Sequence, residues 1–449
     1  MSKSISNAGT LDPAFNKGGV LYFKVPGIFG RPDALLALPD NKILIARGSI
    51  SESDGFMLGR LLEDGTPDSS FGPSRNGFIK VPVKNMQVTI RSLKLLANGG
   101  WLISSDYYVD LDSHGLLIVR MLADGRLDES LNGSGLLFID SRDLPGLSPD
   151  IQVCNTNFNN EPASIMQHKS ANATGASVAE QSGGKFLIFA DTRMNGKRQG
   201  MILRRNADGS SDETFGGGFV IVDLPGIKYE WNQLDGIATQ VSGQILVGGT
   251  YKPENGSLDE RGVFVTRFTS SGQIDMEFNR GLPVVIPNND RIELRNITVD
   301  GKSGRILAVG VAIRERNPNG LIVVLKEDGS YDHSFNKGRP LLSKLGPLGE
   351  GWKRGILQPD GAVVVSGYTG RFTFELTAVT ARFLKDGGLD GAFNSGQGFA
   401  IFDDEKGWEE IADLAQMDDG RIVVCGHFWN TKDSGMNGVD GGWVLRYLA

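Results

Sequence analysis

The sequence predicts an all-β protein, a seven-bladed β-propeller with four antiparallel strands per blade. Three observations lead to this fold. A phrase close to Asp-Gly-x-Leu-Asp-x-x-Phe-Asn/Gly occurs seven times, four short apolar runs recur around each copy, and the two chain ends complement each other. Repetition about every 60 residues is typical of stacked supersecondary units. The copies of this repeat phrase occupy residues 11–15, 64–72, 124–132, 208–216, 271–279, 328–336 and 386–394.

The strands of one blade can be read after the first phrase. Apolar runs at 34–38, 43–46, 56–62 and 78–83 are rich in Ile, Val, Leu and Phe and are separated by turn residues. Such runs predict strands, whereas helices would need amphipathic stretches of about 10–12 residues. The link Pro39-Asp40-Asn41 is typical of a hairpin turn. Four antiparallel strands in each radially repeated unit define a propeller blade.

The two ends of the chain predict how the ring closes. The chain opens with a phrase and a lone fourth strand at 20–25, and it ends with three strands at 411–416, 421–427 and 443–448. The first strand would therefore complete the last blade and cover its exposed edge. A solenoid would need polar caps at its ends instead. We expect one propeller domain over residues 1–449, with an insertion at 141–175 in the third repeat.

The repeated residues carry a family resemblance. The phrase, with its turn, Leu-Asp-x-x-Phe and a following Gly, resembles the bacterial delta-60 repeat over nearly the whole chain. Leu131 departs from the pattern at the aromatic position, Ser271 at the turn Asp, and Pro67 and Ser211 at the Leu. The resemblance implies a propeller-like repeat protein and does not indicate an activity.

The repeated charged residues allow a metal reading and a structural one. Calcium prefers six to eight oxygen ligands, and each phrase supplies two carboxylates at most. We therefore favour an Asp that accepts backbone N–H groups, with the aromatic residue three positions later fastening the loop. An Arg that recurs in the third strands is expected to tie to a carboxylate or carbonyl, and Gly at the ends of second strands to permit close blade packing. These arginines are Arg60, Arg120, Arg204, Arg267, Arg382 and Arg446, and Val324 interrupts the series.

Composition limits the partners and the location. The net charge is -7 and no basic run stands out, so nucleic acid is not an expected partner. No apolar stretch is long enough for a membrane span, and the first residues lack a signal-peptide core. We expect a cytoplasmic protein, with release by a route without a signal left open. Pairing of Cys154 with Cys425 is also left open.

Strand order predicts which face binds a ligand. The first-to-second turns and the phrases share one face, and the longer second-to-third and blade-to-blade connections share the other. We call these the clasp face and the variable-loop face. The insertion at 141–175, with Cys154, Phe158 and His168, belongs to the variable-loop face. Aromatic residues beside acids there suit a sugar or peptide, although wedging between blades is favoured for Trp231, Trp352 and Trp408.

The function predicted is non-catalytic binding or scaffolding, with a glycan or a protein surface as ligand. The candidate ligand-binding residues are Trp231, Trp352, Trp408, Trp429, Tyr229, Tyr107, Tyr368 and His427. No catalytic residue, metal site or cofactor is predicted, because zinc spacings, a G-x-S-x-G elbow and a P-loop are missing. One alternative is a glycan hydrolase or lyase using Asp235, Glu293, Glu410 and Asp413 at the channel mouth. Another is a secreted effector or toxin component.

Overall fold

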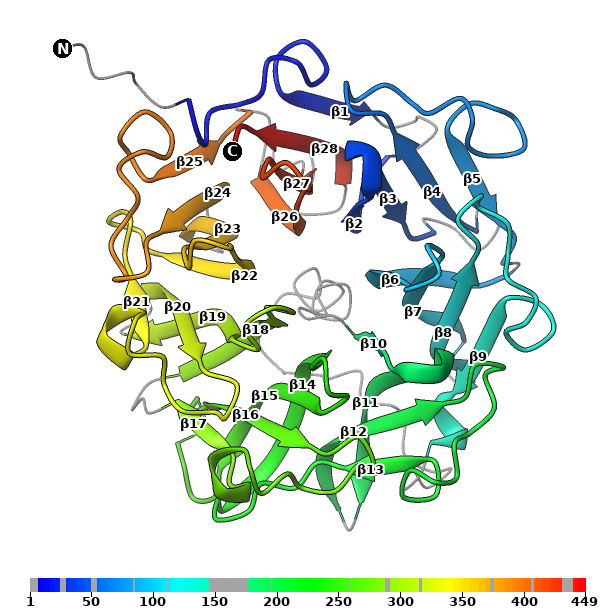
Figure 1. Ribbon diagram of the computed structural model, residues 1–449, viewed down its shortest axis with the longest axis vertical. Helices are drawn as coiled ribbons and strands as arrows, with labels where there is room; N and C mark the ends of the chain where they lie inside the picture. Colours follow the sequence, from blue (N-terminus) through cyan, green and yellow to red (C-terminus); the bar gives the residue numbers. More distant parts are fainter. Residues whose placement is uncertain are drawn as a thin grey trace.

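The computed structural model describes residues 7–24, 30–49, 55–83, 85–110, 113–144, 177–194, 196–257, 259–286, 291–314, 317–371, 375–404, 408–429 and 439–449. These residues form seven four-stranded antiparallel sheets arranged in a ring (Figure 1). The predicted all-β, seven-bladed propeller is therefore confirmed.

Each blade runs from an inner strand beside the propeller axis to an outer strand at the rim (Figure 1). Blade I contains β2 (Ala34–Ala37), β3 (Ile43–Arg47), β4 (Phe56–Leu61) and β5 (Phe78–Val81). Blade II contains β6 (Gln87–Leu95), β7 (Trp101–Asp110), β8 (Ser113–Met121) and β9 (Leu136–Asp140). Blade III contains β10 (Val178–Glu180), β11 (Phe186–Met194), β12 (Lys197–Arg205) and β13 (Phe219–Ile221). Blade IV contains β14 (Tyr229–Thr239), β15 (Ile245–Pro253), β16 (Gly262–Phe268) and β17 (Val284–Ile286); blade V contains β18 (Arg291–Val299), β19 (Ile306–Arg314), β20 (Asn317–Leu325) and β21 (Leu341–Ser343). Blade VI contains β22 (Glu350–Leu357), β23 (Val363–Arg371), β24 (Glu375–Phe383) and β25 (Phe399–Phe402); blade VII contains β26 (Trp408–Gln416), β27 (Ile422–Trp429), β28 (Val439–Tyr447) and β1 (Val20–Lys24). In the described connections lie the short 3-10 segments η1 (Pro39–Asn41), η2 (Ser141–Asp143), η3 (Ser182–Gly184), η4 (Asn279–Gly281) and η5 (Asn336–Gly338).

The ring closes as the sequence predicts. Strand β1 pairs antiparallel with β28, from Val20 opposite Leu445 to Lys24 opposite Gly441, and it is the outer strand of blade VII (Figure 1). A hydrophobic cluster joins the last and first blades, because Cys425 and Val444 pack with Leu35 and Ile43. The ends of the chain are thus held by both a sheet edge and a shared core.

Several strands are longer than the apolar runs indicate. Strand β26 begins at Trp408 and β28 at Val439, several residues before the predicted starts at 411 and 443. Trp231, Trp352 and Trp408 lie within first strands and Trp429 within a second strand. The extra length is polar and glycine-rich, so apolar periodicity does not report it.

Each repeat phrase fastens its own blade and reaches the next one. In blade I, Asp68 Oδ1 accepts the Ser70 N–H at 2.9 Å, and Asp68 Oδ2 accepts Arg60 Nε at 2.8 Å. Arg60 Nη1 also donates to the Ala123 carbonyl of blade II, at 3.4 Å. The phrase is a clasp between blades, which confirms the structural reading of its Asp and Arg. Both carboxylate oxygens of Asp68 thus already accept hydrogen bonds from the protein.

The same ion pair recurs around the ring. Blade V has Val324 instead of the third-strand Arg, and there Arg305 Nε from the first-to-second turn contacts Asp332 Oδ2 at 2.6 Å. The phrase Asp therefore keeps a cationic partner even where the Arg series is interrupted. The remaining pairs are Arg120–Asp128, Arg204–Asp212, Arg267–Asp275, Arg382–Asp390 and Arg446–Asp12.

Glycines in the second strands make room mainly within a blade. A Cβ on Gly367 would lie 1.9 Å from the carbonyl oxygen of Gly351, on the first strand of the same sheet. Gly249, Gly310 and Gly426 meet a first-strand carbonyl in the same way. At Gly48, which directly follows β3, the contact instead reaches the next blade, where a Cβ would lie 2.2 Å from the Val88 carbonyl oxygen. The expected role in blade packing thus applies to Gly48, and the other four permit a bulge in the neighbouring strand.

Candidate functional site

Five inner strands carry a β-bulge at the same place. The register shifts lie between Ile90 and Ser92, Leu234 and Gly236, Leu294 and Asn296, Trp352 and Arg354, and Ile411 and Asp413. The extra residues are Arg91, Asp235, Arg295, Lys353 and Ala412, so four of the five are charged. Because a bulge re-aims a side chain, charged groups can leave the apolar sheet at this level.

These charged side chains gather around the propeller axis. The guanidinium of Arg295 in blade V interacts electrostatically with Asp235 of blade IV and Glu410 of blade VII. Blades V and VII are not neighbours in the ring, so this interaction runs across its interior (Figure 1). We call this group the axial cluster, and it consists of Asp235, Glu293, Arg295, Lys353, Glu410 and His427.

Glu410 is the most connected member of the axial cluster. Its carboxylate contacts the Lys353 ammonium of blade VI and accepts a hydrogen bond from Trp429 Nε1 at 2.9 Å. His427 Nε2 lies 3.3 Å from Glu410 Oε2. Burial lowers the pKa of both Lys353 and His427, although Glu410 opposes the shift in each case. An ammonium group and an indole N–H thus converge on one carboxylate, with an imidazole ring beside it.

Glu293 lies between two guanidinium groups. Arg291 Nε donates to Glu293 Oε1 at 2.7 Å, and Arg295 Nη2 contacts Glu293 Oε2. Burial alone would lower the pKa of Arg295, but Glu293 and the more distant Asp235 and Glu410 raise it. Arg295 therefore carries a full positive charge next to the axis.

Asp235 is the most strongly perturbed acid of the cluster. Thr250 Oγ1 donates to its Oδ2 at 2.6 Å and Gln233 Nε2 to its Oδ1 at 3.1 Å. Burial raises the pKa of Asp235 to about 7, although these two donors and Arg295 act in the opposite direction. Perturbed acids of this kind are common at functional sites.

Asp413, the fourth acid considered from the sequence, does not join the axial cluster. It accepts Arg354 Nε at 2.8 Å on Oδ1 and the Leu35 N–H at 3.1 Å on Oδ2. These contacts tie blades VI, VII and I together, so Asp413 has a structural role.

Two tryptophans lie beside the cluster on the variable-loop face. Trp408 and Trp429 are directly opposite each other on β26 and β27, and both are half-buried. The Trp429 ring also stands edge-on to His427, with ring centroids 5.5 Å apart. The structure therefore brings three predicted residues, Trp408, Trp429 and His427, next to Glu410.

Trp231 lies on the same face in blade IV, between two arginines. The guanidinium carbon of Arg261 is 4.9 Å from the Trp231 ring centroid and that of Arg198 is 5.9 Å away. The ring is half-buried. Cation–π contacts of this kind hold the indole in place while leaving part of it accessible.

The other predicted aromatics are buried in blade packing. Trp352 has no exposed surface, and its Nε1 donates to Ser343 Oγ at 2.9 Å. Tyr229 donates to Asp223 Oδ1 at 2.7 Å, and Tyr107 donates to Asp140 Oδ2 at 3.4 Å. Tyr368 is buried near Arg295. We leave Trp352, Tyr229 and Tyr107 out of the candidate surface, because their rings pack inside the protein.

Sequence reasoning missed Arg295, Lys353 and Arg291. A signal for the first two is present in the chain, since each is a charged residue in the middle of an inner strand and directly follows the residue opposite a second-strand Gly. A charge next to a residue that pairs with glycine marks the bulge.

Part of the predicted site lies outside the described residues. Cys154, Phe158 and His168 fall there, as does the insertion after Leu144. Where the chain is described, Cys425 is a buried free thiol and no group of three or more His, Cys, Asp or Glu is arranged to hold a metal ion. None of the described helices is long and apolar enough to cross a membrane.

Comparison with known proteins gives a short family match and several distant structural matches. A family model described as a domain of unknown function (DUF5122) β-propeller matches residues 38–71, and no curated protein matches the chain. Similar solved structures include a catalytically inactive virginiamycin B lyase from Staphylococcus aureus with quinupristin, at 10% identity and a TM-score of 0.43, covering 96% of this chain and 99% of that one. A protein of unknown function from Dyadobacter fermentans has 10% identity, a TM-score of 0.44 and coverage of 96% and 98%. A PL25 ulvan lyase bound to a glucuronate–sulfated rhamnose unit has 10% identity, a TM-score of 0.46 and coverage of 96% and 95%.

Proposed function

We propose that this protein is a binding module that takes a glycan on the variable-loop face, beside the axial cluster. The observation that carries the proposal is the pair of half-buried indoles, Trp408 and Trp429, next to the carboxylate of Glu410. A sugar ring has an apolar face that stacks on an aromatic ring and hydroxyl groups at its edge that need hydrogen-bond partners. Blade VII supplies both within two adjacent strands.

The neighbouring groups are suited to bind without chemistry. Lys353 and His427 contact the carboxylate of Glu410. The carboxylate of Glu293 holds Arg291 and Arg295 in place. A pre-organised set of donors and acceptors reduces the ordering cost of binding. Trp231, with its flanking Arg198 and Arg261, offers a second aromatic position farther round the same face.

The test is titration calorimetry with neutral, uronate-bearing and sulfated oligosaccharides. Trp408→Ala should weaken the binding of any oligosaccharide that binds by about 30-fold, the effect of losing one central aromatic contact. Phe138→Ala is the matched control, because Phe138 is also a partly exposed aromatic but lies on β9 of blade II. Equal affinities for Trp408→Ala and the parent would contradict the proposal. A stoichiometric protein partner without any glycan binding would favour a scaffolding role instead.

One observation also supports a hydrolase or lyase as a second candidate. Asp235, with a pKa raised to about 7 by burial, shares the axial cluster with the carboxylates of Glu293 and Glu410. An acid that titrates near neutrality is suited to general acid–base catalysis. Release of reducing ends or unsaturated products from a bound glycan, lost in Asp235→Asn while binding persists, would establish this candidate. Glycan binding without product release would favour the binding module over the enzyme.

A further inference from the structure

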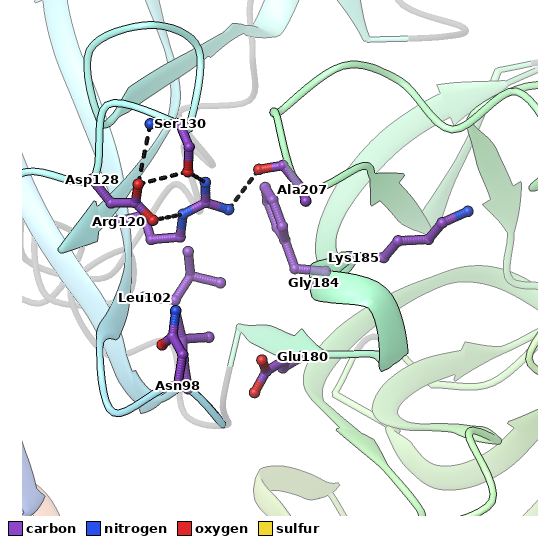
Figure 2. A pocket seen from close by; sticks show the side chains of 11 residues that line it. Asn98, Leu102, Arg120, Asp128, Ser130, Glu180, Gly184, Lys185 and Ala207 are labelled. Atoms are coloured by element: carbon purple, nitrogen blue, oxygen red, sulfur yellow. Dashed lines mark hydrogen bonds and ion pairs between the residues drawn. The ribbon is translucent and has the colours of Figure 1, made fainter. Parts of the chain in front are cut away.

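A pocket of about 180 Å³ lies between blades II and III on the clasp face, opposite the axial site. Figure 2 shows one wall made by the network of Arg120, Asp128 and Ser130, and the other wall made by residues of blade III. Leu102 and Phe186, both buried, lie behind these walls. In some other blades, a cationic side chain contacts the phrase Asp at the corresponding place.

In three blades the phrase Asp holds two cations on the same oxygen. In blade I, Asp68 Oδ2 lies 2.8 Å from Arg60 Nε and 3.1 Å from Lys42 Nζ. In blade III, Asp212 Oδ2 lies 2.7 Å from Arg204 Nε and 2.6 Å from Lys185 Nζ. In blade VII, Asp12 Oδ2 lies 2.8 Å from Arg446 Nε and 3.3 Å from Arg421 Nη1.

Among the described residues, blade II has one cation on its phrase Asp, as blades IV, V and VI also have. The carbonyl oxygens of Lys42 and Lys185 accept the hydrogen bond that closes the first-to-second turn, and in blade II that residue is Gly100, which accepts the Leu96 N–H at 2.9 Å. Within the described part of the chain, Asp128 Oδ2 has one cationic partner, Arg120 Nε at 2.8 Å. The pocket is lined by Asn98 and Leu102, on either side of Gly100, and by Asp128 itself.

The remaining groups in the pocket favour a cation over an anion. Arg120 donates to Asp128, Ser130 and the Ala207 carbonyl, and Lys185 turns its ammonium away toward Asp212 (Figure 2). Their positive charges are therefore engaged by the protein. Glu180 adds a second carboxylate to the lining, and its Oε2 accepts the Ala97 N–H at 3.0 Å. An ammonium group in the pocket would therefore find two carboxylates, those of Asp128 and Glu180.

We propose that this pocket binds a primary alkylammonium group, which takes the place that a lysine side chain occupies in blades I and III. The chemistry is shared by a lysine side chain of another protein and by a free small amine. The proposal does not depend on the function of the axial cluster, because the two sites lie on opposite faces.

The first experiment is a ligand-observed NMR titration of the full-length protein with n-butylammonium. Saturable binding is expected, with affinity about threefold weaker in Glu180→Gln, the size of one partly exposed charge interaction. Neutral n-butanol and tetramethylammonium are the matched probes, and neither should bind, since one lacks the charge and the other lacks N–H donors. Equal binding of n-butanol, or no saturable binding of n-butylammonium, would overturn the proposal.

A second variant tests the comparison between blades without disturbing the pocket. Lys42→Ala removes the second cation from Asp68 in blade I and should lower the melting temperature, and n-butylammonium should restore it more than sodium chloride of equal ionic strength. Equal recovery with the two salts would refute the equivalence of the sites. Nα-acetyl-lysine methylamide and cadaverine then distinguish the sources: binding of the blocked lysine supports a protein lysine, and binding of cadaverine alone supports a free amine.

Discussion

Arg446 Nε donates to Asp12 Oδ2 at 2.8 Å, across 434 residues of chain. The Arg446 side chain is fully buried, and the same guanidinium contacts the Glu63 carbonyl of blade I. This single residue therefore joins the last third strand to the first repeat phrase and to the first blade. Arg446 thus makes the same hydrogen bond to a carbonyl of the next blade as Arg60, Arg120, Arg204 and Arg267 make in their blades.

Asp12→Asn should lower the free energy of unfolding by about 3–5 kcal/mol, because it leaves the buried Arg446 without its carboxylate. The control is Asp124→Asn, since Asp124 pairs with Arg126 at the surface and should cost less than about 1 kcal/mol. Urea unfolding followed by tryptophan fluorescence measures both. Similar midpoints for the two variants would mean that the closing clasp adds no more than a surface pair.

Gly367→Ala should destabilise the protein by about 1–3 kcal/mol, because the new Cβ would meet the Gly351 carbonyl oxygen at the bulge. Gly391→Ala is the matched control, since a Cβ there meets nothing within 4 Å. The control should shift stability by less than about 0.5 kcal/mol. Thermal unfolding of the two variants side by side provides the measurement, and a stable Gly367→Ala protein would argue that the bulge can relax.

Trp352→Ala should cost about 3–5 kcal/mol of stability, the usual effect of emptying a large buried site. It should leave glycan affinity unchanged in the protein that remains folded. Trp408→Ala is expected to show the reverse pattern, with stability nearly unchanged and affinity reduced. Chemical unfolding and calorimetry on both variants check this; a loss of affinity in Trp352→Ala alone would reverse the assignment.

Asp235 makes stability depend on pH in a defined direction. Burial raises its pKa from 3.8 to about 7, so the folded state binds the proton more tightly than the unfolded state. The unfolding free energy should therefore fall as pH rises from about 4 to 7, by up to about 4 kcal/mol from this group. Glu409, whose burial also raises its pKa to about 7, contributes in the same window.

The difference between the parent and Asp235→Asn isolates the contribution of Asp235, because Glu409 is unchanged in both. Asp235→Asn should lose stability less steeply than the parent between pH 4 and 7. Urea unfolding at half-unit pH intervals measures the two slopes. Parallel curves would show that Asp235 titrates alike in the folded and unfolded states.

Much of the fold could be predicted from local patterns. The phrase around Asp68 specifies a turn through a short-range hydrogen bond from the Ser70 N–H, and the short apolar runs on either side of it are strands. The closure followed from counting strands at the two ends. The candidate site could be predicted only in part from the sequence. Trp408, Trp429 and His427 were among the predicted residues and lie together, whereas the rings of Trp352, Tyr229 and Tyr107 are buried.

By itself the sequence determined the number of blades, the strands in each and the partner of the first strand. These depend on contacts between residues close together in the chain or on a repeated pattern. Only the tertiary structure decided which charges meet at the axis, because Asp235, Arg295 and Glu410 come from three blades and two of them, Asp235 and Arg295, are the extra residues of bulges. A bulge changes where one side chain points and leaves the hydrophobic period on either side intact. The periodicity of the sequence therefore does not reveal that these charged side chains lie close together.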